Sequence, residues 1–493
     1  MNTAVDTPIA PSKAATLPFK PDIALSLMIG IIVMALVAFQ PKLLDDGDTW
    51  WHLAAGDWIL NHWTIPTTDP FSYTMPGSPW HAHEWLAEGI MQSVYRLGGW
   101  SGILLFFGAI SGLTFGLLTH ALQRWLTPIQ IAVLIVFIIP ILATKLLARP
   151  HVLAFPVLIV WLTMLVDARA RNRVPHWGWI ALMVFWANLH GSFQVGLGLV
   201  ALCAGEAFLG ARGMGRVTVV RDWGLFFVGC LLASLATPFG FNAHLFAFQV
   251  SNMEALSVIS EWAPTGTTLA TDRLFWLALI AGLLLVVGRG IKLPVLRMVA
   301  VLIFFTLAAL HTRHQTVFMF LMLMLLTPAI GAHLNAPHPA KAPRKRAPAP
   351  RGLIIGLGIA AVALGIARMS VPVTRTDGPN APLSALAAVP ASMRAQPMLN
   401  SYGFGGFLIY SGLRPFIDGR ADMYGDPFTM QASRAENGDA KTLDTLIAKY
   451  KVQWTIFEPD DGSITYMDNL KGWKRLYTDK TAVVHVRGRA GTP

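Results

Sequence analysis

The residues best suited to chemistry lie between positions 45 and 84, directly after the first apolar segment of the chain. Asp45, Asp46 and Asp48 open this stretch. Carboxylates with the spacing D-D-x-D can act as a general base towards a hydroxyl or an amine, or they can hold a divalent cation. Acids in loops are often merely solvated, but acids beside a membrane can also act on a substrate in the bilayer. We therefore take the three aspartates as candidate catalytic residues.

Five tryptophans accompany these aspartates, and two of them follow Asp48 almost directly. A tryptophan ring favours the headgroup layer of a membrane, where one part of it is wet and the other is not. We therefore expect this loop to lie at the bilayer surface. The residues expected to support the loop are Trp50, Trp51, His52, His83 and Glu84.

His81, His83 and Glu84 allow two interpretations. Two histidines separated by one residue fit a strand or a loop, and with Glu84 they can ligate a metal ion. Alternatively, the histidines are an interfacial pair and Glu84 caps a helix that begins at Trp85. A divalent metal is the one cofactor for which the sequence offers ligands, and the sequence does not determine whether it is used.

A second group of candidates is cationic. Lys145, Arg149 and Arg313 lie next to apolar segments, where burying such a charge costs roughly 2.5–3.5 kcal/mol. A compensating anion is expected, and a lipid phosphate is the obvious one. The alternative is that these side chains extend to the headgroups. The residues expected to bind such a phosphate are Lys145, Arg149, His151, His190, Arg313 and His314.

The composition indicates the class of protein that carries these candidate residues. The 493 residues are 54% hydrophobic and only 13% charged, which indicates a polytopic membrane protein rather than a soluble one. Cys203 and Cys230 both fall inside apolar runs, so we interpret them as small buried side chains and expect neither disulfides nor a thiolate metal site.

The apolar segments predict about eleven membrane spans, each near the 20 residues needed to cross a bilayer. The first, Asp22–Phe39, is interpreted as an uncleaved signal anchor, because its polar lead is long and no clear cleavage site follows. The others are expected near residues 101–121, 128–147, 152–167, 177–190, 193–210, 222–237, 273–288, 294–311, 315–333 and 351–369.

The distribution of lysine and arginine among the loops indicates how the chain is oriented in the membrane. If the N-terminus is cytoplasmic, the predicted inner loops hold clearly more of these residues than the outer segments do. This arrangement explains the net charge of +11 as topology and contact with anionic membrane lipids, without nucleic acid. It also gathers polar residues, including most histidines and the pair Glu261-Trp262, at the outer ends, as a polar cavity that opens outward would require.

The segments differ in character along the chain. They are a disordered cytoplasmic start (1–21), a transmembrane domain (22–334) with a large first periplasmic loop (41–100), a basic proline-rich cytoplasmic linker (335–350), a last transmembrane helix (351–369) and a periplasmic α/β domain (375–493). In this last domain GGFLIY, VQWTIF and TAVVHV are typical of strands, and 440–450 of a helix.

The α/β domain also carries a charged glycine-rich motif. Asp418, Arg420 and Asp422 alternate, so on a strand they would share one face. They can form a ligand surface or an ion network that docks this domain onto the membrane body, and we favour docking.

The whole arrangement resembles the GT-C superfamily of integral-membrane glycosyltransferases. A narrower resemblance is to a bacterial group of membrane proteins assigned to glycosyl transfer. The motifs that carry it are Asp48-Thr49-Trp50-Trp51-His52-Leu53-Ala54-Ala55-Gly56, Thr68-Asp69-Pro70-Phe71-Ser72-Tyr73-Thr74, His83-Glu84-Trp85-Leu86-Ala87-Glu88, Arg149-Pro150-His151, Asn188-Leu189-His190-Gly191, Gly405-Gly406-Phe407-Leu408 and Asp418-Gly419-Arg420-Ala421-Asp422. The resemblance implies a polyprenyl-phosphate-linked sugar as donor, with an aspartate as base and Arg149 or Arg313 at the phosphate. The oligosaccharyltransferase branch uses a divalent metal, and other branches do not.

The resulting hypothesis is an inverting glycosyltransferase of the bacterial inner membrane, with its site facing the periplasm. Its acceptor would be a glycan, a lipid or a protein. One alternative is a polysaccharide polymerase or ligase that uses diphosphate-linked glycans and depends on arginine and histidine. Another is a non-catalytic assembly subunit. A transporter is less favoured, because we find no clear repeat and the polar residues gather at one face.

Overall fold

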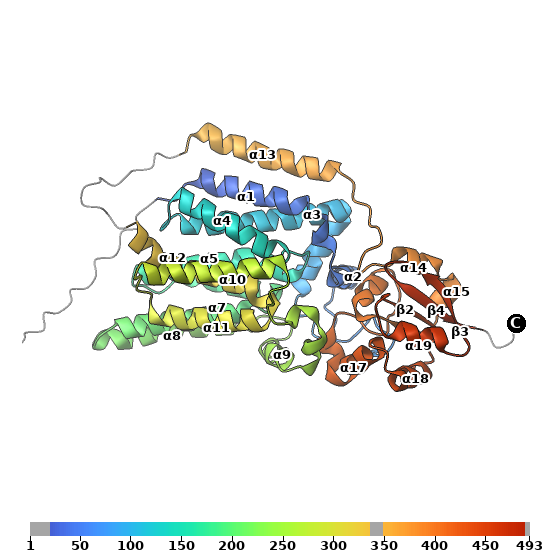
Figure 1. Cartoon of the computed structure of the whole chain (residues 1–493). Helices are drawn as coiled ribbons and strands as arrows, with labels where there is room; N and C mark the ends of the chain where they lie inside the picture. Colours follow the sequence, from blue (N-terminus) through green and yellow to red (C-terminus); the bar gives the residue numbers. More distant parts are fainter. Residues whose placement is uncertain (1–19, 336–348, 489–493) are drawn as a thin grey trace, which may run out of the picture.

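The computed structural model describes residues 20–335 and 349–488. The expected disordered start (1–21) and linker (335–350) therefore lie almost wholly outside the described residues. In the part that is described, every expected apolar span falls on a helix of one membrane body (Figure 1). These helices are α1 (Ile23–Ala38), α3 (Trp85–Leu122), α4 (Pro128–Ala143), α5 (Pro150–Ala170), α6 (Ile180–Leu189), α7 (Phe193–Gly210), α8 (Met214–Ser234), α10 (Ala270–Gly288), α11 (Val295–Leu310), α12 (Gln315–Leu334) and α13 (Arg351–Ser370).

Among the described residues, seven helices are long and apolar enough to cross a membrane. These are α3, α5, α7, α8, α10, α13 and α12 with the turn before it. Shorter apolar helices are α1, α4, α11 and α6 with the turn before it. The protein is therefore an α-helical polytopic membrane protein, as the composition predicts.

Small residues let the first two long helices of the body approach closely. A side chain on Gly30 of α1 would meet the carbonyl oxygen of Gly112 of α3 at 2.9 Å, and Gly108 abuts Ala38 in the same way. Small residues at such contacts are typical of membrane helices, whose association depends on close packing. The side chain of Gln123 then closes one end of the pair, because it accepts from the Asp22 amide at 2.8 Å.

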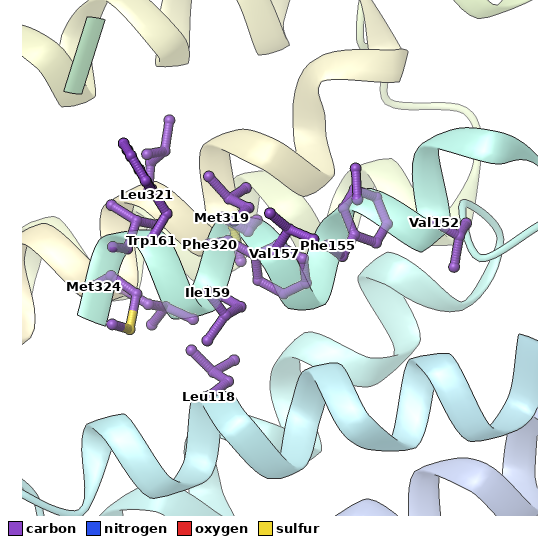
Figure 2. Close-up of a cluster of buried hydrophobic side chains, with 14 of the residues drawn as sticks. Leu118, Val152, Phe155, Val157, Ile159, Trp161, Met319, Phe320, Leu321 and Met324 are labelled. Atoms are coloured by element: carbon purple, nitrogen blue, oxygen red, sulfur yellow. The ribbon is translucent and has the colours of Figure 1, made fainter. Parts of the chain in front are cut away.

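The core of the body lies where α3, α5 and α12 meet (Figure 2). Phe155 of α5 packs against Phe320 of α12, with ring centroids 5.4 Å apart, whereas the Trp161 ring of α5 packs against Trp186 of α6. The indole of Trp161 donates to the Gly196 carbonyl at 3.0 Å, so its one polar atom is satisfied. This packing holds α5 rigidly, and α5 begins directly after Arg149.

The first outer loop is largely helical. Helix α2 (Gly47–His62) runs between the body and the C-terminal domain, followed by a segment that leads into α3 (Figure 1). Trp50 and Trp51 are buried here, and the Trp50 ring packs edge-on against Phe407 and Tyr410 of the C-terminal domain. The expectation that these two rings sit among lipid headgroups was therefore wrong, because a protein surface covers them.

The C-terminal domain is a small sheet flanked by helices, as predicted. Its strands lie in the order β1-β2-β4-β3, with β1 and β2 parallel and the other pairs antiparallel. The strands are β1 (Met398–Asn400), β2 (Trp454–Phe457), β3 (Trp473–Thr478) and β4 (Val483–Arg487). The helices are α14 (Leu383–Ala388), α15 (Ala391–Arg394), α16 (Gly405–Tyr410), α17 (Ala421–Glu436), α18 (Ala440–Lys449) and α19 (Ser463–Asn469).

Two local predictions in this domain were wrong. The run GGFLIY forms helix α16 rather than a strand, since a short apolar run has no periodicity that separates a buried helix from a strand. In addition, Asp418 and Arg420 do not lie on a strand. They belong to the turn before α17, where their side chains bend back toward each other.

Candidate active site

A cavity of about 1260 Å³ opens at the end of the membrane body that carries the C-terminal domain. Its depth is apolar, with Leu158, Leu202, Ile303 and Phe304 among the lining side chains. Its mouth is polar, and the ionisable side chains there are His83, Glu84, Lys145, Arg149, His151, His190, Glu261, Asp272, His311, Arg313 and His314. All six residues expected to bind a carrier phosphate line this cavity.

Arg149 forms the centre of an ion cluster at the cavity wall. Its Nη2 lies 2.6 Å from Asp46 Oδ1 and 3.1 Å from Asp48 Oδ2, its Nε donates to Asp46 Oδ2, and its Nη1 donates to Glu261. Three carboxylates from two distant loops therefore surround one guanidinium.

The local sequence explains why these groups meet. Asp46 is the N-cap of α2, where short acidic side chains accept from the exposed amides of the first turn. Thr49 Oγ1 in that turn donates to the Ala148 carbonyl at 3.0 Å, and the Ala148 amide donates to the Leu43 carbonyl at 3.0 Å. The start of α2 is thus attached to the residue that precedes Arg149.

Within the cluster, Asp48 and Glu261 have different pKa values. Burial raises the pKa of Asp48 to about 7 despite the nearby Arg149, and Asp46 and Glu261 add to the rise. Burial also acts to raise the pKa of Glu261, but Arg149 and Arg313 outweigh it and lower that pKa to about 2. Asp48 therefore titrates near neutral pH and can exchange a proton there.

Glu84 lies among histidines at the same cavity. Its carboxylate is 3.2 Å from His190 Nε2 and 3.8 Å from the Nε2 atoms of His52 and His83. Burial raises the pKa of Glu84 to about 7, against Arg313 and Arg149. Burial also lowers the pKa of His52 and of His190. Glu84 is the N-cap residue of α3, but its side chain makes no capping hydrogen bond, so the predicted side-chain cap is absent.

Two other cations, Arg313 and Lys145, line the cavity. The Arg313 guanidinium stacks on Trp262, with its carbon 4.5 Å from the ring centroid. Within the described residues neither Arg313 nor Lys145 forms an ion pair. Burial lowers the pKa of Lys145, although Asp272 and Glu261 oppose it. These two side chains are the ones that an incoming phosphate can meet.

The C-terminal domain covers the other side of the aspartate cluster. Arg420 is fully buried and pairs with Asp418 and with Asp69 of the first loop, each at 2.7 Å. Its guanidinium also lies over the Phe71 and Trp80 rings. The docking interpretation of the charged motif is confirmed by this contact.

The structure separates the three candidate aspartates. Asp46 and Asp48 belong to the Arg149 cluster, whereas Asp45 is exposed and is not part of it. Glu261 was not among the predicted site residues, and its only sequence signal is its place beside Trp262 at an outer end. Across the described ranges, no group of three or more histidine, cysteine, aspartate or glutamate side chains is arranged to hold a metal ion.

Comparison with known proteins identifies structures that have a similar fold to this chain. No protein-family model matches this chain, and no curated protein matches it. The archaeal oligosaccharyltransferase AglB from Archaeoglobus fulgidus, solved with an inhibitory peptide and a dolichol-phosphate, is similar over 95% of this chain and 75% of its own, with a TM-score of 0.55 and 9% identity. The apo form of the Archaeoglobus fulgidus oligosaccharyltransferase is similar over 96% and 74%, with a TM-score of 0.52 and 10% identity. The chain therefore has the fold of these archaeal oligosaccharyltransferases.

Proposed function

We propose that the protein is a glycosyltransferase that moves a sugar from a polyprenyl-phosphate carrier to an acceptor outside the membrane. The observation that carries this proposal is the cavity, which joins an apolar depth to the cations Arg313 and Lys145, and whose lining residue Arg149 has its Nη2 3.1 Å from Asp48 Oδ2. A lipid-linked phosphate needs apolar room for its chain and cations for its headgroup. The similar AglB structure was solved with a dolichol-phosphate, which agrees with this choice of donor.

In the proposed mechanism Asp48 is the general base. It takes the proton of the acceptor hydroxyl or amine while the acceptor atom attacks the anomeric carbon. The bond from that carbon to the phosphate oxygen breaks, and its electron pair leaves with the phosphate. Arg313 and Lys145 neutralise the charge that develops on the phosphate. Trp51 Nε1 donates to Asp48 Oδ1 at 2.9 Å and keeps the carboxylate oriented.

The proposed setting is the bacterial inner membrane, with the cavity open to the periplasm and the N-terminus in the cytoplasm. The excess of basic residues in the opposite loops supports this orientation. The acceptor is then a glycan, a lipid or a protein of the cell envelope.

The test is transfer of labelled sugar from a panel of polyprenyl-phosphate sugars to envelope acceptors, in membranes that contain the full chain. Asp48→Asn should lower transfer by roughly 10²–10⁴-fold, the usual contribution of a general base. Asp45→Asn is the matched control, because Asp45 is an exposed aspartate three residues away. Full activity of Asp48→Asn would refute the role of Asp48 as general base. Loss only in arginine variants would instead favour a ligase of diphosphate-linked glycans.

A further inference from the structure

The ion cluster around Arg149 bears on the metal that oligosaccharyltransferases use. Asp46, Asp48 and Glu261 supply the type of ligand that a hard divalent cation takes, namely carboxylate oxygens. Such a cation also requires those oxygens to be free. Whether these three residues fit a divalent cation therefore depends on whether their oxygens are free.

Five of the six carboxylate oxygens are already engaged. Both oxygens of Asp46 accept from Arg149, and Glu261 Oε1 accepts from its Nη1. Asp48 uses Oδ1 for the Trp51 indole and has Oδ2 at 3.1 Å from Arg149 Nη2. The guanidinium thus lies where the oxygens converge, and its positive charge repels a second cation there. These residues do not fit a divalent metal.

The backbone keeps the guanidinium in this place. Ala148, directly before Arg149, is hydrogen-bonded through both its amide and its carbonyl to the segment 43–49. Pro150, directly after it, is the first residue of α5 and has a fixed backbone angle. Arg149 therefore has little freedom to leave the carboxylates.

We propose that the Arg149 guanidinium takes the position of a divalent cation and supplies positive charge there, so that this site works without metal. The inference rests on the proposed function. Arg149 is then a positioning residue, which holds Asp48 beside Glu261 and Asp46 by hydrogen bonds of fixed geometry. A metal ion would hold the same three carboxylates by coordination.

The test is Mn²⁺ binding to the purified full-length protein, measured by electron paramagnetic resonance. The wild-type protein should bind no Mn²⁺ at this site, and the transfer reaction should be unchanged by EDTA. Arg149→Met removes the charge at similar length, so it should create stoichiometric Mn²⁺ binding. That binding should disappear again when Asp48→Asn or Glu261→Gln is added. Arg313→Met, which removes a cation from the same cavity but not from the cluster, should create no Mn²⁺ site.

Two results would overturn the inference. One is wild-type Mn²⁺ binding that is lost in Asp48→Asn. The other is a folded Arg149→Met protein, monodisperse in size-exclusion chromatography, that binds no Mn²⁺. If Arg149→Met does not fold, Mn²⁺ binding to the wild-type protein and to Asp48→Asn tests the inference by itself. Polyprenyl-phosphate binding to the wild-type protein, measured separately, tests the proposed function, so the two failures are distinguishable.

Discussion

At the scale of single residues, the environment distinguishes groups that the sequence presents as equivalent. Asp45, Asp46 and Asp48 lie within four positions, yet one is exposed, one is held on both oxygens by Arg149, and one has a pKa near 7. A general base works best when its pKa lies near the working pH. Asp48 is therefore the aspartate best suited to accept a proton.

The pH dependence of the reaction should follow from this assignment. The base acts in its ionised form, so the transfer rate should rise with pH through about 7, the pKa of Asp48, and fall as Asp48 becomes protonated below it. A pH–rate profile under donor-limited conditions measures this. Asp45→Asn should leave the profile in place. A rate that does not change across neutral pH would contradict the role of Asp48.

Donor binding should depend on Arg313. Replacing it by alanine removes a charge-assisted hydrogen bond worth about 1.5–3 kcal/mol, so binding of the polyprenyl-phosphate donor should weaken by roughly 10- to 100-fold. Donor titration by tryptophan fluorescence or by isothermal calorimetry measures the change. Arg273→Ala is the control, since Arg273 is an exposed cation outside the cavity lining. Equal affinities of the two variants would place the phosphate elsewhere.

At the scale of elements, α2 is held between the membrane body and the C-terminal domain. Gly406 of α16 abuts the Gly47 carbonyl, and Gly419 abuts the Asp48 side chain and the Trp51 indole. No larger residue fits at these contacts without displacing α2. The two elements therefore determine together where Asp48 points.

Gly419→Ala should displace Asp48. The added methyl would overlap Asp48 Oδ1, and such overpacking costs about 1–3 kcal/mol. Transfer should fall while the protein still inserts, as measured by activity per folded protein. Gly378→Ala is the control, because a methyl there meets no atom within 4 Å. Unchanged activity of Gly419→Ala would show that Asp48 needs no such confinement.

Arg420 should attach the C-terminal domain to the first loop. Arg420→Met leaves the buried Asp418 and Asp69 without their cation, and breaking such a buried pair costs about 3–5 kcal/mol. Limited proteolysis should then cleave near residues 371–382 faster than in the wild-type protein. Arg434→Met, at an exposed arginine of α17, should change nothing. Equal cleavage rates in both variants would contradict the docking role.

At the scale of the whole molecule, the site is at one end of the membrane body. Helix α2 and the C-terminal domain lie there (Figure 1), and Arg149 of the cavity lining pairs with the start of α2. The loop between α7 and α8, with Arg212, lies at the opposite end of α7 from the cavity residue His190. One orientation in the membrane therefore decides which compartment the site faces.

Cysteine labelling should determine that orientation. The native Cys203 and Cys230 are buried, which gives a low background. A membrane-impermeant maleimide added to spheroplasts should label Lys441→Cys in the C-terminal domain and should not label Arg212→Cys, because both native side chains are exposed but at opposite ends. Permeabilised cells, in which both should react, are the control. The reverse pattern would place the site in the cytoplasm.

The sequence by itself determined the membrane class and the apolar helices, because hydropathy and composition are local properties. Only the tertiary structure decided which polar groups meet. Arg149 lies 103 residues from Asp46 and 112 from Glu261, and no local pattern links such partners. The same holds for Trp50, whose ring packs against Phe407 in a domain more than 300 residues away. Which residues so far apart in the sequence come into contact depends on the packing and the charge balance of the whole chain.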